Sequence, residues 1–211
     1  NKQPSENTES TALDPDIIAR TNAQDAIDDG KLEQAETALR DILTRRPKDP
    51  EVLGGLGMIK LKQGQHDEAE KWFNDAVLAA QGGETSKWRS LILVARFWKN
   101  MHLADEALTE GRLSDAEQAV QRCLALQADE PNALALLGNI KSAGGDDTEA
   151  ERLYRQALAK EGYNVAAISG LLKLLARTGR RDEALALVEQ VNQNYAEELD
   201  KNPVVHAGLL R

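Results

Sequence analysis

The chain has 211 residues, with 26 Lys and Arg against 35 Asp and Glu, which gives a formal net charge of −9. Its single cysteine excludes an internal disulfide scaffold, and no apolar run approaches the roughly 18 residues of a membrane-spanning helix. Nucleic-acid binding is also disfavoured, because neutralising phosphates requires a basic face.

Residues 1–15 form the first segment and are mainly Pro, Ser, Thr, Asn and Glu. Such a composition buries too little apolar surface to offset the entropy lost on ordering. We therefore expect a flexible N-terminal segment.

Five similar segments follow one another along the rest of the chain. In each one a glycine is followed five residues later by an alanine, then by a larger apolar residue four further on and another apolar residue three beyond that. The glycines are Gly30, Gly64, Gly111, Gly145 and Gly179, and the alanines are Ala35, Ala69, Ala116, Ala150 and Ala184. The larger apolar residues are Leu39, Phe73, Val120, Tyr154 and Val188, and the last set is Ile42, Ala76, Cys123, Ala157 and Val191.

This spacing predicts a helix–turn–helix unit. A glycine ends a helix by adopting a positive φ, and polar residues such as Ser114, Asp146 and Asp182 stand where the next helix needs an N-cap. The alanine and the two apolar residues after it share one helical face. The alanine must be small because the paired helix crosses there.

The interval between the alanines is 34 residues from Ala35 to Ala69, from Ala116 to Ala150 and from Ala150 to Ala184. A helical period of this length resembles the tetratricopeptide repeat family, as do the Leu56-Gly57 and Leu137-Gly138 pairs and the junctions "RRPKDPEV" and "ADEPNALAL". The resemblance implies an all-α fold, an α-solenoid in which helix–turn–helix units form a right-handed superhelix. Where Ala23, Ala104 or Leu172 replaces the glycine of the pair, we expect wider packing.

The expected organisation follows from this register. Residues 16–83 hold repeats one and two, residues 97–198 hold repeats three to five, and residues 199–211 are the start of a further repeat or a capping helix. The interval from Ala69 to Ala116 is 47 residues, which places an insertion at residues 84–96 that extends the first helix of repeat three.

The insertion is the least regular part of the sequence. "ETSKWRSLILVARFW" contains Trp88, Arg89 and Arg96 in an otherwise acidic chain. One helix is predicted from about Lys87 to about Thr109. It either protrudes and offers these three residues as a binding surface, or packs on the preceding helix pair because Leu91 to Val94 require burial.

No catalytic or cofactor-binding motif stands out, and the three histidines have no metal-ligand spacing. Cys123 occupies the small apolar slot of its repeat and is interpreted as a buried packing residue. "GGLG" at 54–57 lacks the Lys-Ser/Thr of a phosphate loop and lies in a helical pattern. We therefore expect a non-enzymatic chain without a cofactor or metal.

Tetratricopeptide arrays bind a peptide or partner helix along the groove lined by the first helix of each repeat. In this register the groove positions are Met58, Lys62, Met101, Asp105, Asn139, Ser142, Lys173 and Arg177. Their charge changes from Asp105 to Lys173 and Arg177, so the expected ligand is a protein segment with an acidic end near Lys173.

The segment "KWRSLILVARFWKNMHLADEALTEGRLSDAEQAVQRCLAL", with "AERLYRQAL" and "LLARTGRRDEALAL", is similar to the repeats of the cellulose synthase operon protein C family. That resemblance implies a periplasmic scaffold for exopolysaccharide synthesis or export, with other subunits of the complex as partners. The alternative is a cytoplasmic adaptor that binds a peptide. Direct glucan binding is disfavoured, because the chain has only 3 Trp, 3 Tyr and 2 Phe.

Overall fold

The computed structural model describes residues 14–196, which contain ten α-helices and no β-strand. The helices are α1 (Pro15–Asp28), α2 (Leu32–Arg45), α3 (Pro50–Lys62), α4 (His66–Ala79), α5 (Ser86–Thr109), α6 (Leu113–Leu126), α7 (Pro131–Ala143), α8 (Asp147–Lys160), α9 (Val165–Arg177) and α10 (Arg181–Asn194). The all-α repeat architecture is confirmed. The segments predicted at residues 1–15 and 199–211 lie outside this range, apart from Asp14, which is the N-cap of α1, and Pro15, with which α1 begins.

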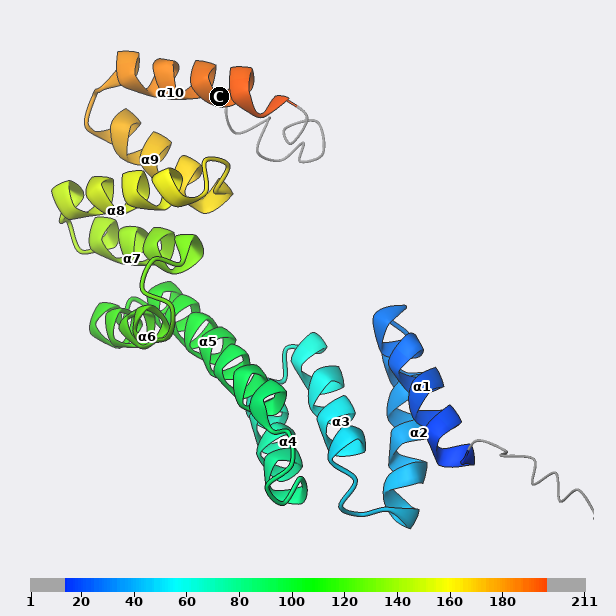
Figure 1. The fold of residues 1–211 in the computed structure, drawn as a ribbon. Coiled ribbons are helices and arrows are strands. Elements are labelled where there is room, and N and C mark those ends of the chain that lie inside the picture. The colour runs from blue at the N-terminus through cyan, green and yellow to red at the C-terminus, as the bar shows by residue number, and fades with distance from the viewer. Residues whose placement is uncertain (1–13, 197–211) are drawn as a thin grey trace, which may run out of the picture. The chain divides into compact units, whose positions relative to one another are not determined.

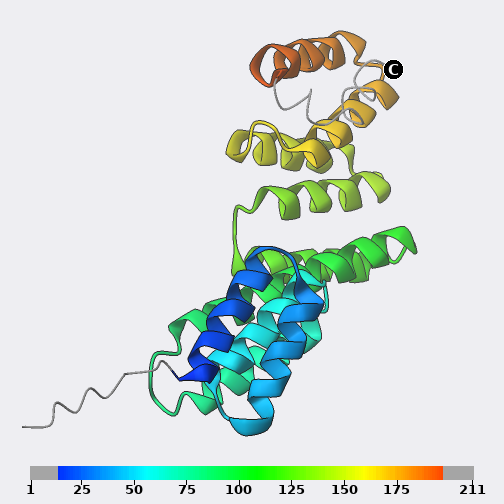
Figure 2. The same ribbon diagram turned by 90° about the vertical axis from the view of Figure 1, so that its right-hand side faces the viewer.

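The chain divides into two compact units, residues 1–96 and 97–211, and the boundary falls within α5. In the first unit α1 pairs with α2, and α3 pairs with α4 (Figure 1). In the second unit α7 packs against α6, α8 and α9, and α9 packs against α10, so that successive helices lie in layers (Figure 2).

Each turn between paired helices has a glycine with positive φ. Gly30, Gly64, Gly111, Gly145 and Gly179 have φ angles of 77°, 74°, 75°, 84° and 73°, as predicted. The N-cap prediction is right only for Asp146, whose carboxylate accepts a hydrogen bond from the backbone N–H of Glu149 at 3.1 Å. It is wrong for Ser114 and Asp182, because α6 and α10 begin at Leu113 and Arg181 and place both residues inside the first turn.

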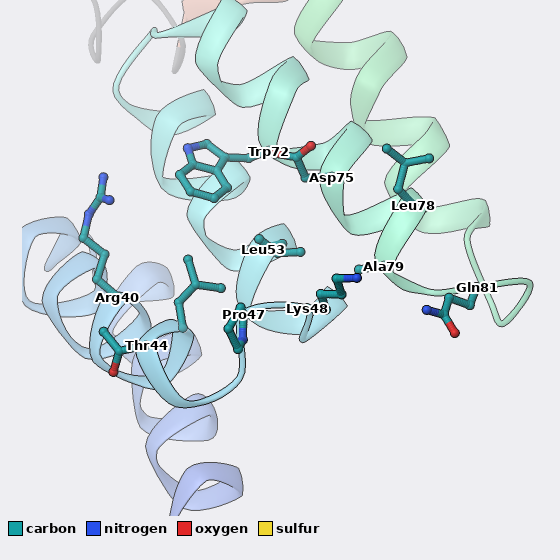
Figure 3. Close-up of a pocket in the computed structure, with 11 residues that line it drawn as sticks. Arg40, Thr44, Pro47, Lys48, Leu53, Trp72, Asp75, Leu78, Ala79 and Gln81 are labelled. Atoms are coloured by element: carbon teal, nitrogen blue, oxygen red, sulfur yellow. The ribbon is translucent and has the colours of Figure 1, made fainter.

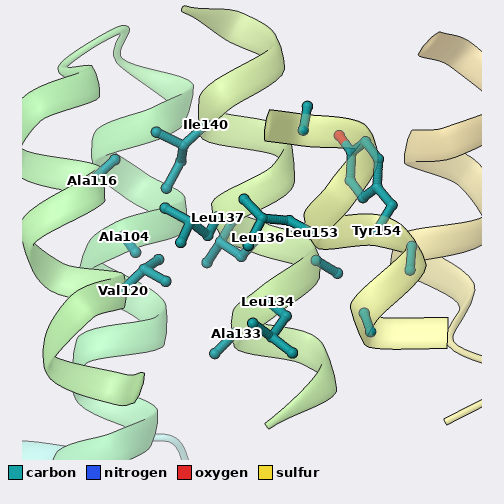
Figure 4. Packing of buried hydrophobic residues seen from close by; sticks show 14 of the residues in the cluster. Ala104, Ala116, Val120, Ala133, Leu134, Leu136, Leu137, Ile140, Leu153 and Tyr154 are labelled. Carbon is teal, nitrogen blue, oxygen red and sulfur yellow. The ribbon is translucent and has the colours of Figure 1, made fainter. Parts of the chain in front are cut away.

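The predicted seam lies in the core. Ala35, Ala69, Ala116 and Ala150 are all completely buried, and the larger residues that follow them pack against the paired first helix. Figure 4 shows the second unit, where Leu137 and Ile140 of α7 face Ala116 and Val120 of α6 while Leu153 and Tyr154 pack from α8. Only the fifth repeat differs, with Ala184 and Val188 partly exposed on α10, the last helix described.

The Leu-Gly pairs have a steric cause. A Cβ atom on Gly57 would lie 2.6 Å from the ring of Phe73, and one on Gly138 would lie 2.6 Å from the ring of Tyr154. The three repeats without this glycine have Leu39, Val120 or Val188 in place of the aromatic ring. The size of the residue at this position of the first helix is therefore matched by the size of the seam residue on the second helix. A residue larger than glycine does not by itself require wider packing where the seam residue is aliphatic.

A ladder of ion pairs joins each repeat to the next. The residue after the seam alanine is Glu36, Glu70, Glu117 or Glu151 in the first four repeats, and each of these glutamates pairs with a cation of the next helix pair. The pairs are Lys60–Glu36, Arg96–Glu70, Lys141–Glu117 and Arg180–Glu151. In the fifth repeat the corresponding residue is Leu185, which is 53% exposed.

The long helix predicted across the insertion is observed as α5, with 24 residues against 13 or 14 in each of the other nine described helices. Trp88, Ile92 and Ala95 of its first part are buried in the core of the first unit. Leu93 and Val94 stay 49% and 37% exposed, so the expectation that Leu91 to Val94 are all buried is wrong.

Candidate partner-binding surface

Four of the predicted groove residues lie on two first helices that pack against each other in the second unit. Asn139 and Ser142 belong to α7, and Lys173 and Arg177 belong to α9. The 34-residue period places Asn139 and Lys173 at equivalent positions of their repeats. The fold therefore brings these four side chains to one surface.

A polar network holds part of this surface in place. The Tyr154 hydroxyl donates a hydrogen bond to Asn139 Oδ1 at 2.8 Å. Arg177 donates to Ser142 Oγ at 3.0 Å and to Asp147 Oδ1 at 2.6 Å. Burial raises the pKa of Tyr154 to about 12, so its hydroxyl remains a hydrogen-bond donor well into the alkaline range.

Two members of this network, Tyr154 and Asp147, were missed at the level of sequence. Tyr154 was assigned only to the core, yet its hydroxyl reaches the polar surface beside Gly138 and Gly170, where an added Cβ would lie 2.6 Å and 2.4 Å from the tyrosine ring. The sequence signal for the position of Tyr154 was Gly170 in the predicted helix of the next repeat. A glycine within a helix lowers its stability, so its presence there indicates that another side chain packs against it.

The observed pairing changes the charge pattern expected for the groove. Arg177 is bound to Asp147, and Arg180 is bound to Glu151 and Glu183. These two guanidinium charges are therefore compensated within the chain. Lys173 is exposed on α9, one turn before Arg177, and forms no ion pair with any residue from 14 to 196.

The other predicted groove residues differ in how far they are exposed to solvent. Met101 is partly buried against the second unit's core, and Asp105 is exposed on the same helix. In the first unit Met58 is partly buried and packs against two hydrophobic clusters, so it is largely a core residue. Lys62 is exposed near the end of α3.

Of the three residues proposed as an insertion surface, Trp88 is wrongly placed there because it is buried. Trp88 is only 5% exposed and stacks on Phe73, with ring centroids 6.3 Å apart. Its indole fills the space left by Gly54, where a Cβ would lie 2.0 Å away. Arg89 and Arg96 are exposed, but Arg89 donates to Thr85 Oγ1 at 3.2 Å and Arg96 pairs with Glu70 at 2.6 Å.

Cys123 is completely buried, as predicted, and its thiol donates to the Phe97 carbonyl at 3.5 Å. Burial raises the pKa of this thiol to about 11, which disfavours the reactive thiolate. Within residues 14–196 no group of three or more His, Cys, Asp or Glu side chains is arranged to hold a metal ion. No helix of this range is long and apolar enough to span a bilayer.

Comparison with known proteins agrees with this architecture. Two sequence profiles described as tetratricopeptide repeat match the chain, one over residues 26–92 and 143–202 and the other over residues 102–165. Among solved structures, the type IV pilus biogenesis factor PilW aligns with 90% of this chain and 99% of its own at a TM-score of 0.55 and 18% identity. The tetratricopeptide domain of P58(IPK) aligns with 92% of this chain and 54% of its own, at a TM-score of 0.52 and 16% identity.

Two curated relatives are more similar in sequence. Cellulose synthase operon protein C of Xanthomonas axonopodis pv. citri is 35% identical over 184 residues, which is 87% of this chain and 12% of the relative. Its counterpart in Pseudomonas fluorescens is 31% identical over 172 residues, 82% of this chain and 13% of the relative. The chain thus spans about an eighth of the length of these relatives. The matched repeats, the paired helices and the 34-residue seam together show that this chain belongs to the tetratricopeptide repeat family and is related to cellulose synthase operon protein C.

Proposed function

We propose that this chain is a non-enzymatic protein-interaction scaffold in the periplasm, where it serves the synthesis or export of cellulose or a similar exopolysaccharide. The observation that carries this proposal is the similarity to cellulose synthase operon protein C over most of the chain. Helical-repeat arrays present extended surfaces to protein partners. The partners are accordingly other subunits of the polysaccharide synthesis or export complex.

The partner-binding surface is formed by α7 and α9 around Asn139, Ser142, Lys173 and Arg177. The hydrogen bonds of Tyr154 and Arg177 fix three of these side chains, so a partner meets polar groups that are already ordered. Pre-ordering lowers the entropic cost of association. Lys173 adds a positive charge that none of the described residues pairs with, and this charge selects a partner segment with an acidic end and orients it.

The test is charge reversal at Lys173 in the full-length protein, in cells that export the polysaccharide. Lys173→Glu is expected to lower polysaccharide output while leaving the amount of protein and its helical content unchanged. Arg122→Glu is the matched control, because Arg122 is exposed on the second helix α6 of the same unit. Equal output from the parent and both variants would contradict the assignment of the surface.

A third variant tests whether the charge of Lys173, and not only its position, contributes to binding. Lys173→Gln removes the charge without reversing it, and its effect is expected to lie between those of the parent and Lys173→Glu. Because electrostatic steering is screened by salt, the difference in partner capture between these variants should shrink as the ionic strength rises. A difference that is independent of salt would argue for a steric role of the lysine stem.

A further inference from the structure

A second candidate surface lies in the first unit, on the side formed mainly by second helices. Helix α2, the connection after it, Leu53 of α3 and helix α4 enclose a hollow of about 760 Å³ (Figure 3). Its apolar lining consists of Leu43, Pro47, Leu53, Trp72, Leu78 and Ala79. A volume of this size is typical of ligand pockets, and it is large enough for one or more bulky side chains of a partner.

Two of these residues are not explained by the repeat. Trp72 lies three residues after the seam alanine Ala69, and Leu78 lies nine after it. The residues that correspond to Trp72 in the other repeats are Ala38, Ala119, Leu153 and Leu187, and those that correspond to Leu78 are Thr44, Ala125, Ala159 and Gln193. Repeat two therefore has the largest residue at both positions, and both line the same hollow.

Leu78 is 75% exposed, the highest value among the exposed large apolar residues of the described chain. A leucine at this position contributes little to the core. Trp72 is partly buried and lies below the guanidinium of Arg40, which is 6.0 Å from the ring centroid. An exposed leucine and a partly exposed tryptophan line the same hollow, and exposed apolar surface of this kind marks protein interaction sites.

The charged residues at the edge of the hollow indicate which charges a bound partner segment should have. Arg40 is already paired with Glu36 at 2.7 Å. Lys48 and Asp75 also line the hollow, and neither forms an ion pair with another residue between 14 and 196. Lys48 comes from the connection between α2 and α3, and Asp75 comes from α4 (Figure 3). The hollow thus offers one cation and one anion from separate elements.

We propose that this hollow binds a segment of a partner protein that inserts a large apolar side chain against Trp72 and Leu78. The segment has a carboxylate that pairs with Lys48 and a cationic side chain that pairs with Asp75. Charge pairs of this kind set the direction in which a segment lies, while the apolar contact provides most of the affinity. The surface is separate from the one on α7 and α9, and the proposal does not depend on it.

The first test is selection of displayed random short peptides against the full chain, with Leu78→Asp as the counter-selection target. The proposal predicts enriched peptides with an apolar side chain between an acidic and a basic residue, and affinities reduced about tenfold or more by Leu78→Asp. Leu185→Asp is the matched control, because Leu185 is a 53% exposed leucine on the second helix α10. It should leave binding unchanged.

A charge exchange tests the direction of binding. In the Lys48→Glu, Asp75→Lys double variant, the enriched peptides should lose affinity, and versions with their acidic and basic residues exchanged should regain it. Circular dichroism of each variant checks the fold, since Lys48 is exposed but Asp75 is partly buried.

Three results would overturn the proposal. The first is a selection that yields no peptide whose binding depends on Leu78, and the second is an unchanged peptide preference in the charge-exchange variant. The third is another occupant: a dimer of the chain that Leu78→Asp dissociates in analytical ultracentrifugation, or cello-oligosaccharides that shift the NMR signals of Trp72 and compete with the peptides.

Discussion

The glycine–aromatic match in repeat two predicts a specific energetic coupling. In the Gly57→Ala variant the new Cβ would lie 2.6 Å from two atoms of the Phe73 ring, and Phe73 is completely buried. Overpacking of a closed core costs about 1–3 kcal/mol. An alanine in a helix interior is favoured over glycine by about 1 kcal/mol. The expected net result is a loss of about 1 kcal/mol in the free energy of unfolding.

The sign reverses once the ring is removed. Repeat one pairs Ala23 with Leu39 at the corresponding positions, so Phe73→Leu creates room for the methyl group. On that background Gly57→Ala should stabilise by up to about 1 kcal/mol, through helix propensity alone. The double-mutant cycle is therefore expected to give a coupling energy of about 2 kcal/mol between positions 57 and 73.

Urea denaturation is the assay, followed by circular dichroism for the whole chain and by tryptophan fluorescence for the first unit. The fluorescence is measured in a Trp98→Phe background, because Trp98 belongs to the second unit. Fluorescence is informative because Trp88 stacks on Phe73. Two probes are needed, since repeat proteins unfold in more than one step when cooperativity between repeats is weak. A Gly57→Ala variant that is more stable than the parent on the native background would refute the steric account.

Three further predictions follow from the core and the ion-pair ladder. Ala150→Leu should destabilise by about 1–3 kcal/mol, because Ala150 is completely buried at a helix crossing; an unchanged melting temperature would show that the seam is misplaced. Cys123 should react with a thiol reagent at pH 8 at least about a hundredfold more slowly in the folded chain than in urea, since burial raises its pKa to about 11; rapid reaction of the folded chain would contradict its burial. The hydrogen bond from Arg180 lowers the pKa of Glu151 below its ordinary value of 4.5. The ionised Glu151 therefore stabilises the folded chain at pH values above 4.5, and this stabilisation is lost as the pH falls through the lower pKa of the folded state. Glu151→Gln should therefore cost up to about 1 kcal/mol at pH 7 and weaken the acid dependence of the unfolding free energy, whereas an unaltered pH profile would mean that the pair contributes nothing.

The seam, the turns and the long helix were predictable because each depends on residues close together in sequence. A glycine five residues before a buried alanine specifies both the positive φ and the start of the second helix, as at Gly145 and Ala150. The repetition supports this prediction, because the same spacing of glycine and alanine recurs in five places. Sequence reasoning was therefore reliable for the elements and for the buried face of each one.

Side-chain partners between repeats were harder to predict. Burial of Trp88 depends on Gly54, which lies 34 residues earlier and opens space on α3. The compensation of Arg177 depends on Asp147, 30 residues away at the start of α8. The glutamate after each seam alanine was visible in four repeats, but its cation does not lie at a constant distance: it follows 24 residues later in the first and third repeats, 26 in the second and 29 in the fourth. Spacing within one repeat does not contain this information.

Site-specific photocrosslinking from position 173 tests the proposed scaffold role most directly. A photoreactive amino acid is placed at Lys173 of the full-length protein in cells that export the polysaccharide, with position 122 as the control, and crosslinked proteins are identified by mass spectrometry. The account predicts that position 173, and not position 122, crosslinks to a periplasmic portion of another subunit of the polysaccharide machinery. Crosslinks to cytoplasmic proteins, or the same products from both positions, would contradict it.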